Sequence, residues 1–569
     1  MESSRDYTYY KEHAQDVKLE DITSSQQNKD ILQKLRDGDP EFRTLCILDE
    51  SMDDDADDEF IVEEEDDLGW LGYFIGESNT LKDLLVKCFM TGTSLIEGIC
   101  RNRTIESLDI ENNVGNYLYF GQMFKNNRRL KSLLFECSRM NAHDFAVSLG
   151  QQSHLKCLNF DHMDLSDEDV SVIAKALIAQ PQLEALQFES NDFERNCCTV
   201  LKTTFMKWGE KSQLKKLDLS ENDIDDERLS ILLGGLVCCH NLVELTLNCN
   251  IDISAAGLRS LSSYFQHDNC CLEILNLHNV QIDDDGAEAL ASELVHCESL
   301  KCLNVSRNQI GDTGIAALVS GLTAANANLE RLVLSDNRFS TAGIRSLSDL
   351  IQSQSTTLKD LSVDDMQIDD DGISILAHTL TNNTKLQSLA LDVRASNNAV
   401  AVKNTFKKVL CDTSSINNIY LSNHTLRSIG WRNPFREGDD CTKYFDLNRR
   451  GQILEPEDRG LVPMIKILIN YPDLGEMEPF YQWKLQVLPM IVAWFWKASA
   501  TRRYLDESMK KFQRREVSAV YRFIRGVPQL VADGYWSQQL KQVRLKKRKL
   551  EEREKQLLER LGRGKSPSV

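Results

Sequence analysis

The sequence lacks the short motifs that are typical of metal or catalytic sites. Its 16 cysteines include no CxxC pair, which excludes finger-type zinc patterns, and its 10 histidines include no HExxH. The C-terminal GRGKS has Glu559 where a phosphate-binding loop needs its first glycine. We therefore predict no enzyme activity, no cofactor and no bound metal.

Long apolar segments are also missing. The longest run, residues 487–496, is too short for a bilayer span and contains Pro489. The N-terminal MESSRDYTYYKEH has no apolar core of a secretory signal. We expect a cytoplasmic protein with reduced thiols and no membrane segment.

Positive charge is in deficit, and the formal net charge is -21. An anionic surface repels nucleic acid, which is excluded as the main ligand, and attracts basic proteins. One basic cluster, KKRK at 546–549, is typical either of a nuclear-import signal or of an exposed helix. A nuclear location therefore stays open beside the cytoplasmic one.

A repeat fills most of the chain. Residues 300–322, LKCLNVSRNQIGDTGIAALVSGL, combine LxxLxL with a later asparagine and a helix-spaced apolar pattern. Most steps between copies are 28 to 31 residues. The copies begin at Ile105, Leu130, Leu155, Leu183, Leu214, Leu242, Leu272, Leu300, Leu329, Leu358, Leu386 and Ile416.

This pattern resembles the leucine-rich-repeat family in its ribonuclease-inhibitor-like subtype. The resemblance implies an α/β solenoid, or horseshoe, with parallel strands on the concave face and helices outside. Segments such as LGWLGYFIG also resemble those of uncharacterised leucine-rich-repeat proteins of microalgae. In the family the repeated asparagine turns inward, so we expect it to bind loop backbone groups of adjacent repeats.

Five regions are predicted along the chain. Residues 1–40 form a polar N-terminal segment, and 41–80 form an N-terminal unit with an acidic loop, SMDDDADDEFIVEEEDD. Residues 81–426 form the solenoid. A helical C-terminal cap over 427–535 covers the last repeat, and 536–569 form a charged helix and tail with capacity for weak self-association.

The acidic loop does not predict a calcium site. Asp53, Asp55, Asp57 and Glu64 have part of the spacing of a calcium-binding loop, but Asp58 stands where a glycine is needed for the turn. A solvated acidic loop explains the run equally well.

The concave face is the predicted binding surface. Residues between the leucines of LxxLxL point away from the core, and many are acidic, among them Asp109, Glu111, Glu136, Asp161, Glu189 and Glu221. The candidate partner-binding residues are Asp218, Glu244, Asn276, Asn304, Asp336, Asp360, Asp364 and Asp365.

Two functions follow from this interpretation. The first is a non-enzymatic scaffold that binds a basic protein on the acidic concave face. The alternative is a GTPase-activating protein, because the repeats also resemble those of Ran GTPase activators. Such an activator needs a group that stabilises the transferring phosphoryl group, and Arg101, Arg103, Arg128 and Arg129 are the arginines near early repeats.

Overall fold

The computed structural model describes residues 6–49, 59–62, 65–87, 93–111, 127–136, 140–267, 270–325, 328–353, 356–364, 368–381, 383–391, 399–430, 440–453 and 461–470. Its internal contacts divide the chain into two units. The N-terminal unit contains residues 1–403 and 428–434, and the C-terminal unit contains residues 404–427 and 435–569.

One parallel sheet runs through the N-terminal unit, with its strands in the order β15-β14-β13-β12-β11-β10-β9-β8-β7-β6-β5-β4-β3-β1-β2. Sequential strands are neighbours from β3 to β15, as stacked repeats require. The strands are β1 (Thr44–Asp49), β2 (Glu59–Val62), β3 (Asp83–Lys87), β4 (Ser107–Glu111), β5 (Ser132–Glu136), β6 (Cys157–Asp161), β7 (Ala185–Glu189), β8 (Lys216–Asp218), β9 (Glu244–Thr246), β10 (Ile274–Asn276), β11 (Cys302–Asn304), β12 (Arg331–Val333), β13 (Asp360–Ser362), β14 (Ser388–Ala390) and β15 (Ser428–Ile429).

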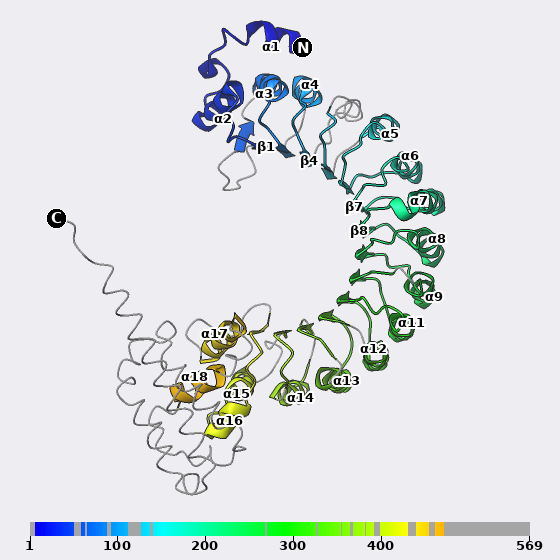
Figure 1. Cartoon of the computed structure of the whole chain (residues 1–569), viewed down its shortest axis with the longest axis vertical. Helices are drawn as coiled ribbons and strands as arrows, with labels where there is room; N and C mark the ends of the chain where they lie inside the picture. Colours follow the sequence, from blue (N-terminus) through cyan, green and yellow to red (C-terminus); the bar gives the residue numbers. More distant parts are fainter. Residues whose placement is uncertain are drawn as a thin grey trace, which may run out of the picture. The chain divides into compact units, whose positions relative to one another are not determined.

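Helices cover one face of this sheet, and the other face lines the inside of the curved N-terminal unit (Figure 1). The predicted α/β solenoid is confirmed. The helices of this unit are α1 (Tyr7–His13), α2 (Gln26–Asp37), α3 (Glu65–Glu77), α4 (Thr93–Arg101), α5 (Ala142–Leu149), α6 (Asp167–Leu177), α7 (Arg195–Trp208), α8 (Asp226–Leu236), α9 (Ala255–Ser260), α10 (Ser262–Phe265), α11 (Asp284–Leu294), α12 (Asp312–Ala324), α13 (Thr341–Gln352) and α14 (Asp370–Thr381), with α15 (Ala399–Leu410) shared between the units.

The core is built from rows of equivalent side chains in register. One leucine of each repeat lies directly opposite that of the next, and each is at most 1% exposed: Leu217, Leu245, Leu275, Leu303 and Leu332. Earlier repeats carry phenylalanine two residues later. The rings of Phe160 and Phe188 stack with centroids 4.9 Å apart. Each repeat therefore completes the apolar surface of its neighbour.

The repeated asparagines join adjacent repeats, as predicted. Asn222 is 1% exposed, and its Oδ1 accepts from the backbone N–H of Asn191 at 3.0 Å. Its Nδ2 donates to the carbonyls of Phe188 and Ser220. Asn250 repeats the arrangement one unit later, accepting from the N–H groups of Asn222 and Ile224. The buried amide thus satisfies loop backbone groups that water cannot reach.

The aspartates at the helix starts act in two ways. Asp283 caps its own helix α11 by accepting from the N–H of Gly286 at 2.9 Å. The adjacent Asp284 instead reaches forward and accepts from the N–H groups of Gly311 and Gly314, at the start of α12. Asp226 and Asp312 reach the next helix start in the same way. These forward contacts were not predicted.

The forward aspartates also explain a repeated glycine. A Cβ added to Gly314 would lie 2.6 Å from the Asp284 carboxylate, and one added to Gly257 would lie 2.3 Å from that of Asp226. Neither glycine has a positive backbone φ angle. Close packing rather than an unusual turn requires glycine there.

The acidic loop prediction needs one correction. Glu59–Val62, in the middle of the predicted loop, forms the edge strand β2, in which Phe60 is fully buried. Helix α2 covers this edge: Gln27 donates to the carbonyl of Glu59, and Asn28 both donates to the carbonyl of Ile61 and accepts from its N–H. The edge backbone is therefore occupied rather than open to another strand.

The last predicted repeat start is also wrong. Residues from Ile416 form helix α16 (Ile416–Leu421) and not a strand, because Ser415 caps the helix by accepting from the N–H of Asn418 at 3.1 Å. The last strand among the described residues is β15, with Leu426 and Ile429 at the apolar positions. The C-terminal unit adds α17 (Asp440–Ile453) and α18 (Leu461–Asn470). The predicted tail at 536–569 lies outside the described residues.

Candidate protein-binding face

Two rows of charged side chains cross the sheet, one where the strands begin and one where they end. The first, which we call the lysine–glutamate rim, lies just before the strands, one residue after the first apolar position of each repeat. It consists of Lys82, Glu106, Lys131, Lys156, Glu184, Lys215, Glu273, Lys301, Glu330 and Lys359.

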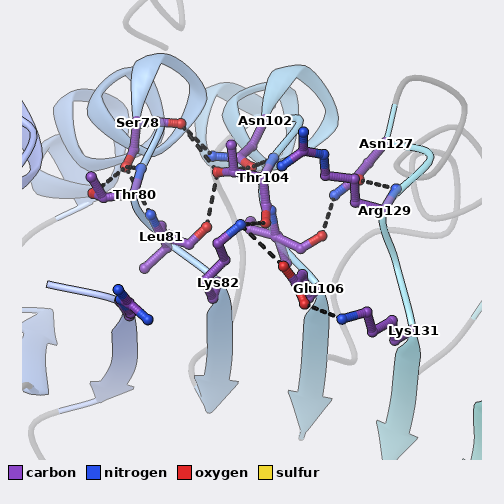
Figure 2. Close-up of polar contacts among 12 residues, drawn as sticks. Ser78, Thr80, Leu81, Lys82, Asn102, Thr104, Glu106, Asn127, Arg129 and Lys131 are labelled. Carbon is purple, nitrogen blue, oxygen red and sulfur yellow. Dashed lines mark hydrogen bonds and ion pairs between the residues drawn. The ribbon is translucent and has the colours of Figure 1, made fainter. Parts of the chain in front are cut away.

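The rim is neutralised within itself. Glu106 pairs with Lys82 at 3.1 Å and with Lys131 at 2.5 Å, as Figure 2 shows. Glu184 makes the same double pair with Lys156 and Lys215. Hydrogen bonds from two lysines lower the pKa of each glutamate to about 2. The rim therefore mixes both signs of charge, and its six lysines and four glutamates leave only a small positive excess.

A polar frame positions the start of the rim (Figure 2). Asn102 accepts from the N–H groups of Thr104 and Ile105, and the Thr104 hydroxyl donates to the carbonyl of Leu81 at 2.8 Å. Asn127 then donates to the carbonyl of Ile105. These bonds fix the backbone from which Lys82 and Glu106 project.

The second row, which we call the carboxylate row, lies at the ends of β4 to β7. Glu111, Glu136, Asp161 and Glu189 are direct partners on successive strands. They alternate with the buried residues of their strands and so face the inner side of the sheet. Since parallel strands lie about 4.8 Å apart, four like charges are held side by side.

Burial and mutual repulsion perturb this row. Desolvation, followed by the charges of Asp161 and Asp218, raises the pKa of Glu189 to about 7. Desolvation, followed by Glu111 and Asp161, raises the pKa of Glu136. Both shifts disfavour the ionised form, so the row is electrostatically strained at neutral pH.

Two acids that lie two residues earlier in the strand register extend the row. Desolvation, then Glu111, raises the pKa of Asp109 to about 6, and its Oδ1 is buried without a hydrogen-bond partner. Desolvation also raises the pKa of Asp218, against the effect of hydrogen bonds from Ser220. The Oδ1 of Asn159 is likewise buried and without a partner.

Two basic side chains, Lys87 and His162, contact carboxylates of this row. The Lys87 ammonium lies 3.2 Å from Glu111. The His162 Nδ1 lies 2.5 Å from Asp161, and this hydrogen bond raises the pKa of the histidine. Glu189 accepts a hydrogen bond from the Nε2 of Gln187 at 2.7 Å.

Most of the predicted site residues lie further along the sheet, and several are paired internally. Glu244 pairs with Lys216 at 2.7 Å, and Asp336 pairs with Arg307 at 3.4 Å. Asp364 accepts from the hydroxyls of Ser335 and Ser362. These contacts reduce the free charge of that half of the face.

The remaining predicted residues are distributed as follows. Asp218 accepts from the Ser220 hydroxyl at 2.6 Å. Asn276 donates to Thr246, and Asn304 accepts from Ser306. Asp360 is half-buried on β13, and Asp365 lies outside the described residues. The prediction covered the face but missed that its strained carboxylates are concentrated on β4 to β8.

Other chemistry has little support in the described part of the chain. There, no group of three or more histidine, cysteine or acidic side chains has the arrangement of a metal site. Arg101, considered for GTPase activation, is engaged by Glu97 at 2.6 Å and lies over the Tyr7 ring. Among the described helices, none has the length and apolar character of a membrane span.

The sequence matches known repeat proteins. A family model described as "Leucine Rich repeat" matches residues 212–227, 268–291, 296–319 and 325–348. The ribonuclease inhibitor of Sus scrofa is 26% identical over 317 residues, covering 45% of this chain and 68% of that protein. The ribonuclease inhibitor of Mus musculus is 26% identical over 261 residues, covering 46% of this chain and 56% of that protein.

A larger relative matches over a similar part of the chain. "NACHT, LRR and PYD domains-containing protein 14" of Mus musculus is 26% identical over 284 residues, covering 47% of this chain and 28% of its own length. This chain therefore spans only part of that protein, and the similarity concerns the repeats. Together with the strand-and-helix unit of each repeat, these matches show that the chain is built from leucine-rich repeats and is similar to the ribonuclease inhibitors.

Proposed function

We propose that this protein is a non-enzymatic binding scaffold whose inner face receives a partner with a basic surface. One observation carries the proposal: Glu111, Glu136, Asp161 and Glu189 face one another on successive strands without intervening lysines. Where the strands of the same sheet begin, by contrast, each of Glu106 and Glu184 lies between two lysines. The carboxylate row thus contains more acidic than basic groups, unlike the lysine–glutamate rim.

The energetics favour a cationic ligand. Like charges directly opposite on neighbouring strands are destabilising, and desolvation adds to the cost of keeping them ionised. Lysine or arginine side chains of a partner would offset both effects. Complementary charge would also raise the association rate and select the orientation of the partner.

The architecture supports the general function. Stacked repeats present an extended curved surface, and such surfaces serve protein binding. One group of relatives is named as inhibitors of ribonucleases, which supports binding of another protein as the mode of action. The proposal includes a cytoplasmic location, with which the free thiols of the described cysteines agree.

The test compares two triple variants of equal charge change. The row variant carries Glu136→Gln, Asp161→Asn and Glu189→Gln. The control variant carries Glu168→Gln, Glu210→Gln and Glu288→Gln, which are exposed and lie on α6, on the short helix Gly209–Lys211 and on α11. Binding of fluorescent decalysine would be measured by anisotropy at low ionic strength and at about 0.15 M salt.

We expect the row variant to weaken decalysine binding at least about tenfold and the control variant less than about twofold. Equal weakening by both variants would show a general charge effect and contradict the proposed site. A third variant, with Asp218→Asn, Glu244→Gln, Asp360→Asn and Asp364→Asn, tests the half of the face predicted from the sequence. Loss of binding in that variant alone would move the site to β8 through β13.

A further inference from the structure

At two helix ends of the solenoid an asparagine of the next repeat binds the free carbonyls. Asn102 donates to the carbonyls of Ile75, in the last turn of α3, and of Ser78 just beyond it. Asn383 donates to the carbonyl of Ile351, in the last turn of α13. These bonds satisfy carbonyls that have no partner within their own helix.

Helix α15 ends differently. The carbonyl of its last residue, Leu410, accepts from the Nζ of Lys466 at 2.7 Å. The same Nζ donates at 3.0 Å to the carbonyl of Asn423, beyond α16. Lys466 belongs to α18, so one side chain of the C-terminal unit joins three of its segments. Lys466 therefore binds the free carbonyl at the end of α15, as Asn102 and Asn383 do at the ends of α3 and α13.

The surroundings of this lysine are unusual for a cation. Lys466 is fully buried, and no carboxylate of the described residues forms an ion pair with it. In the described part of the C-terminal unit, the titratable groups that face it are Cys411 next to the end of α15, His424 after α16, and Tyr444 of α17, whose ring centroid is 5.7 Å from Nζ. Burial lowers the pKa of the ammonium to about 7.

The neighbouring histidine adds no compensating negative charge. His424 is half-buried, its Nε2 lies 3.1 Å from the carbonyl of Tyr420, and its Nδ1 is buried without a hydrogen-bond partner. Burial, followed by the charge of Lys466, lowers the pKa of His424 well below its usual value. Both groups are therefore pushed toward their neutral forms inside the closed unit.

We propose that Lys466 is a pH-dependent latch of the C-terminal unit, which fastens α18 to the end of α15 and to the Asn423 turn and which tightens as the solution becomes more alkaline. A neutral amine still donates to both carbonyls but avoids the cost of a buried charge. In the open unit the amine faces water and regains its ordinary pKa of about 10.4. Closing therefore releases a proton.

The direction of the effect follows from that release. Between about pH 7 and pH 10 the open form binds one more proton than the closed form, so the closed form gains stability as pH rises. Below about pH 7 both forms hold the proton, and Lys466 adds no further pH dependence. Full coupling to one proton changes the opening equilibrium by about tenfold per pH unit.

The test is hydrogen–deuterium exchange of the full chain between about pH 7 and pH 8.5, corrected for intrinsic exchange rates. In the closed form His424 is neutral and Cys411, whose pKa is raised by burial, stays protonated throughout this window. In the open form both groups have ordinary pKa values of about 6.5 and 8.5, so the part of the window between about pH 7.3 and pH 7.8 reports mainly on Lys466. We expect protection of peptides from 404–427 and 461–470 to rise with pH by up to about tenfold per unit. Peptides of β5 to β12 serve as the internal reference.

Three variants complete the test. Lys466→Met should remove the pH dependence, whereas Lys408→Met, the same change at an exposed site of α15, should leave it intact. Lys466→Arg keeps a permanent charge and should reduce protection throughout the window. A wild-type slope of zero would overturn the proposal, even if Lys466→Met failed to fold. A slope that persists in Lys466→Met would assign the effect to another group and reject the latch.

Discussion

Asp161 and Glu189 are direct partners on β6 and β7, with both carboxylates on the inner face of the sheet. The pair is unfavourable when both groups are ionised, and the structure meets this cost by holding a proton. The pKa of Glu189 is raised to about 7, with desolvation as the main cause and Asp161 as the next.

This pair predicts how stability depends on pH. Between the ordinary glutamate pKa of about 4.3 and the raised value, the folded protein binds a proton that the unfolded chain releases. The contribution of Glu189 is therefore favourable at acidic pH and is lost as pH rises toward 7. Glu189→Gln should reduce the fall in the urea midpoint between about pH 5 and pH 7.5.

The exposed Glu210→Gln is the matched control, and its midpoint should follow the wild type at both pH values. Glu189→Gln should be at least as stable as the wild type at the higher pH, because the amide resembles the protonated acid. A variant that loses stability there would show that the ionised carboxylate is favourable, contrary to its raised pKa.

Asn222 is predicted to be a main contributor to stacking. Asn222→Ala leaves the N–H of Asn191 and the carbonyls of Phe188 and Ser220 without this partner. Each unsatisfied buried group costs roughly 1 to 3 kcal/mol, so we expect a loss of about 2 kcal/mol or more in unfolding free energy. The measurement is urea denaturation followed by circular dichroism.

Asn328→Ala removes the same amide from an exposed position, where it donates to the carbonyl of Glu298. We expect that control to lose less than about 0.5 kcal/mol, as is usual for surface substitutions. Similar losses in both variants would mean that burial of Asn222 contributes no more than an exposed hydrogen bond.

Leu303→Asp tests the register of the sheet. Leu303 is fully buried between Leu275 and Leu332, so the new carboxylate would have no partner. The expected loss is about 3 to 5 kcal/mol, measured by urea denaturation. The neighbouring Asn304→Asp puts the same carboxylate on the inner face and should cost far less. Equal costs would contradict the alternation of faces along β11.

Repeat spacing predicted much of the fold because only a few arrangements of strand and helix can bury the repeated leucines in one core. The leucines of LxxLxL must share one face with the helix positions, so the sequence located β3 through β14 and their inward asparagines. The strand Glu59–Val62 was missed because acidic residues surround it and only Phe60 is fully buried. The error at Ile416 arose because IxxIxL also fits a helix, and a serine cap decided between them.

The site was harder to predict because charge pairing depends on neighbours in space. Lys216 and Glu244 are separated by a whole repeat in sequence, yet their side chains meet at 2.7 Å. Unequal repeat lengths hide such pairs in the sequence, and they hide the run of adjacent carboxylates from Glu111 to Glu189 equally well. Only the strand register shows which acids are neutralised and which are left facing one another.

The forward-reaching aspartates have a consequence for how such a chain can grow or shrink. Asp226, Asp284 and Asp312 each accept from an amide group in the first turn of the following helix, so these helix starts are fully hydrogen-bonded only together with the preceding repeat. Gain or loss of one whole period leaves every donor with an equivalent acceptor. An insertion that breaks the period does not, and gene duplication in steps of one repeat is thus the route of least disruption.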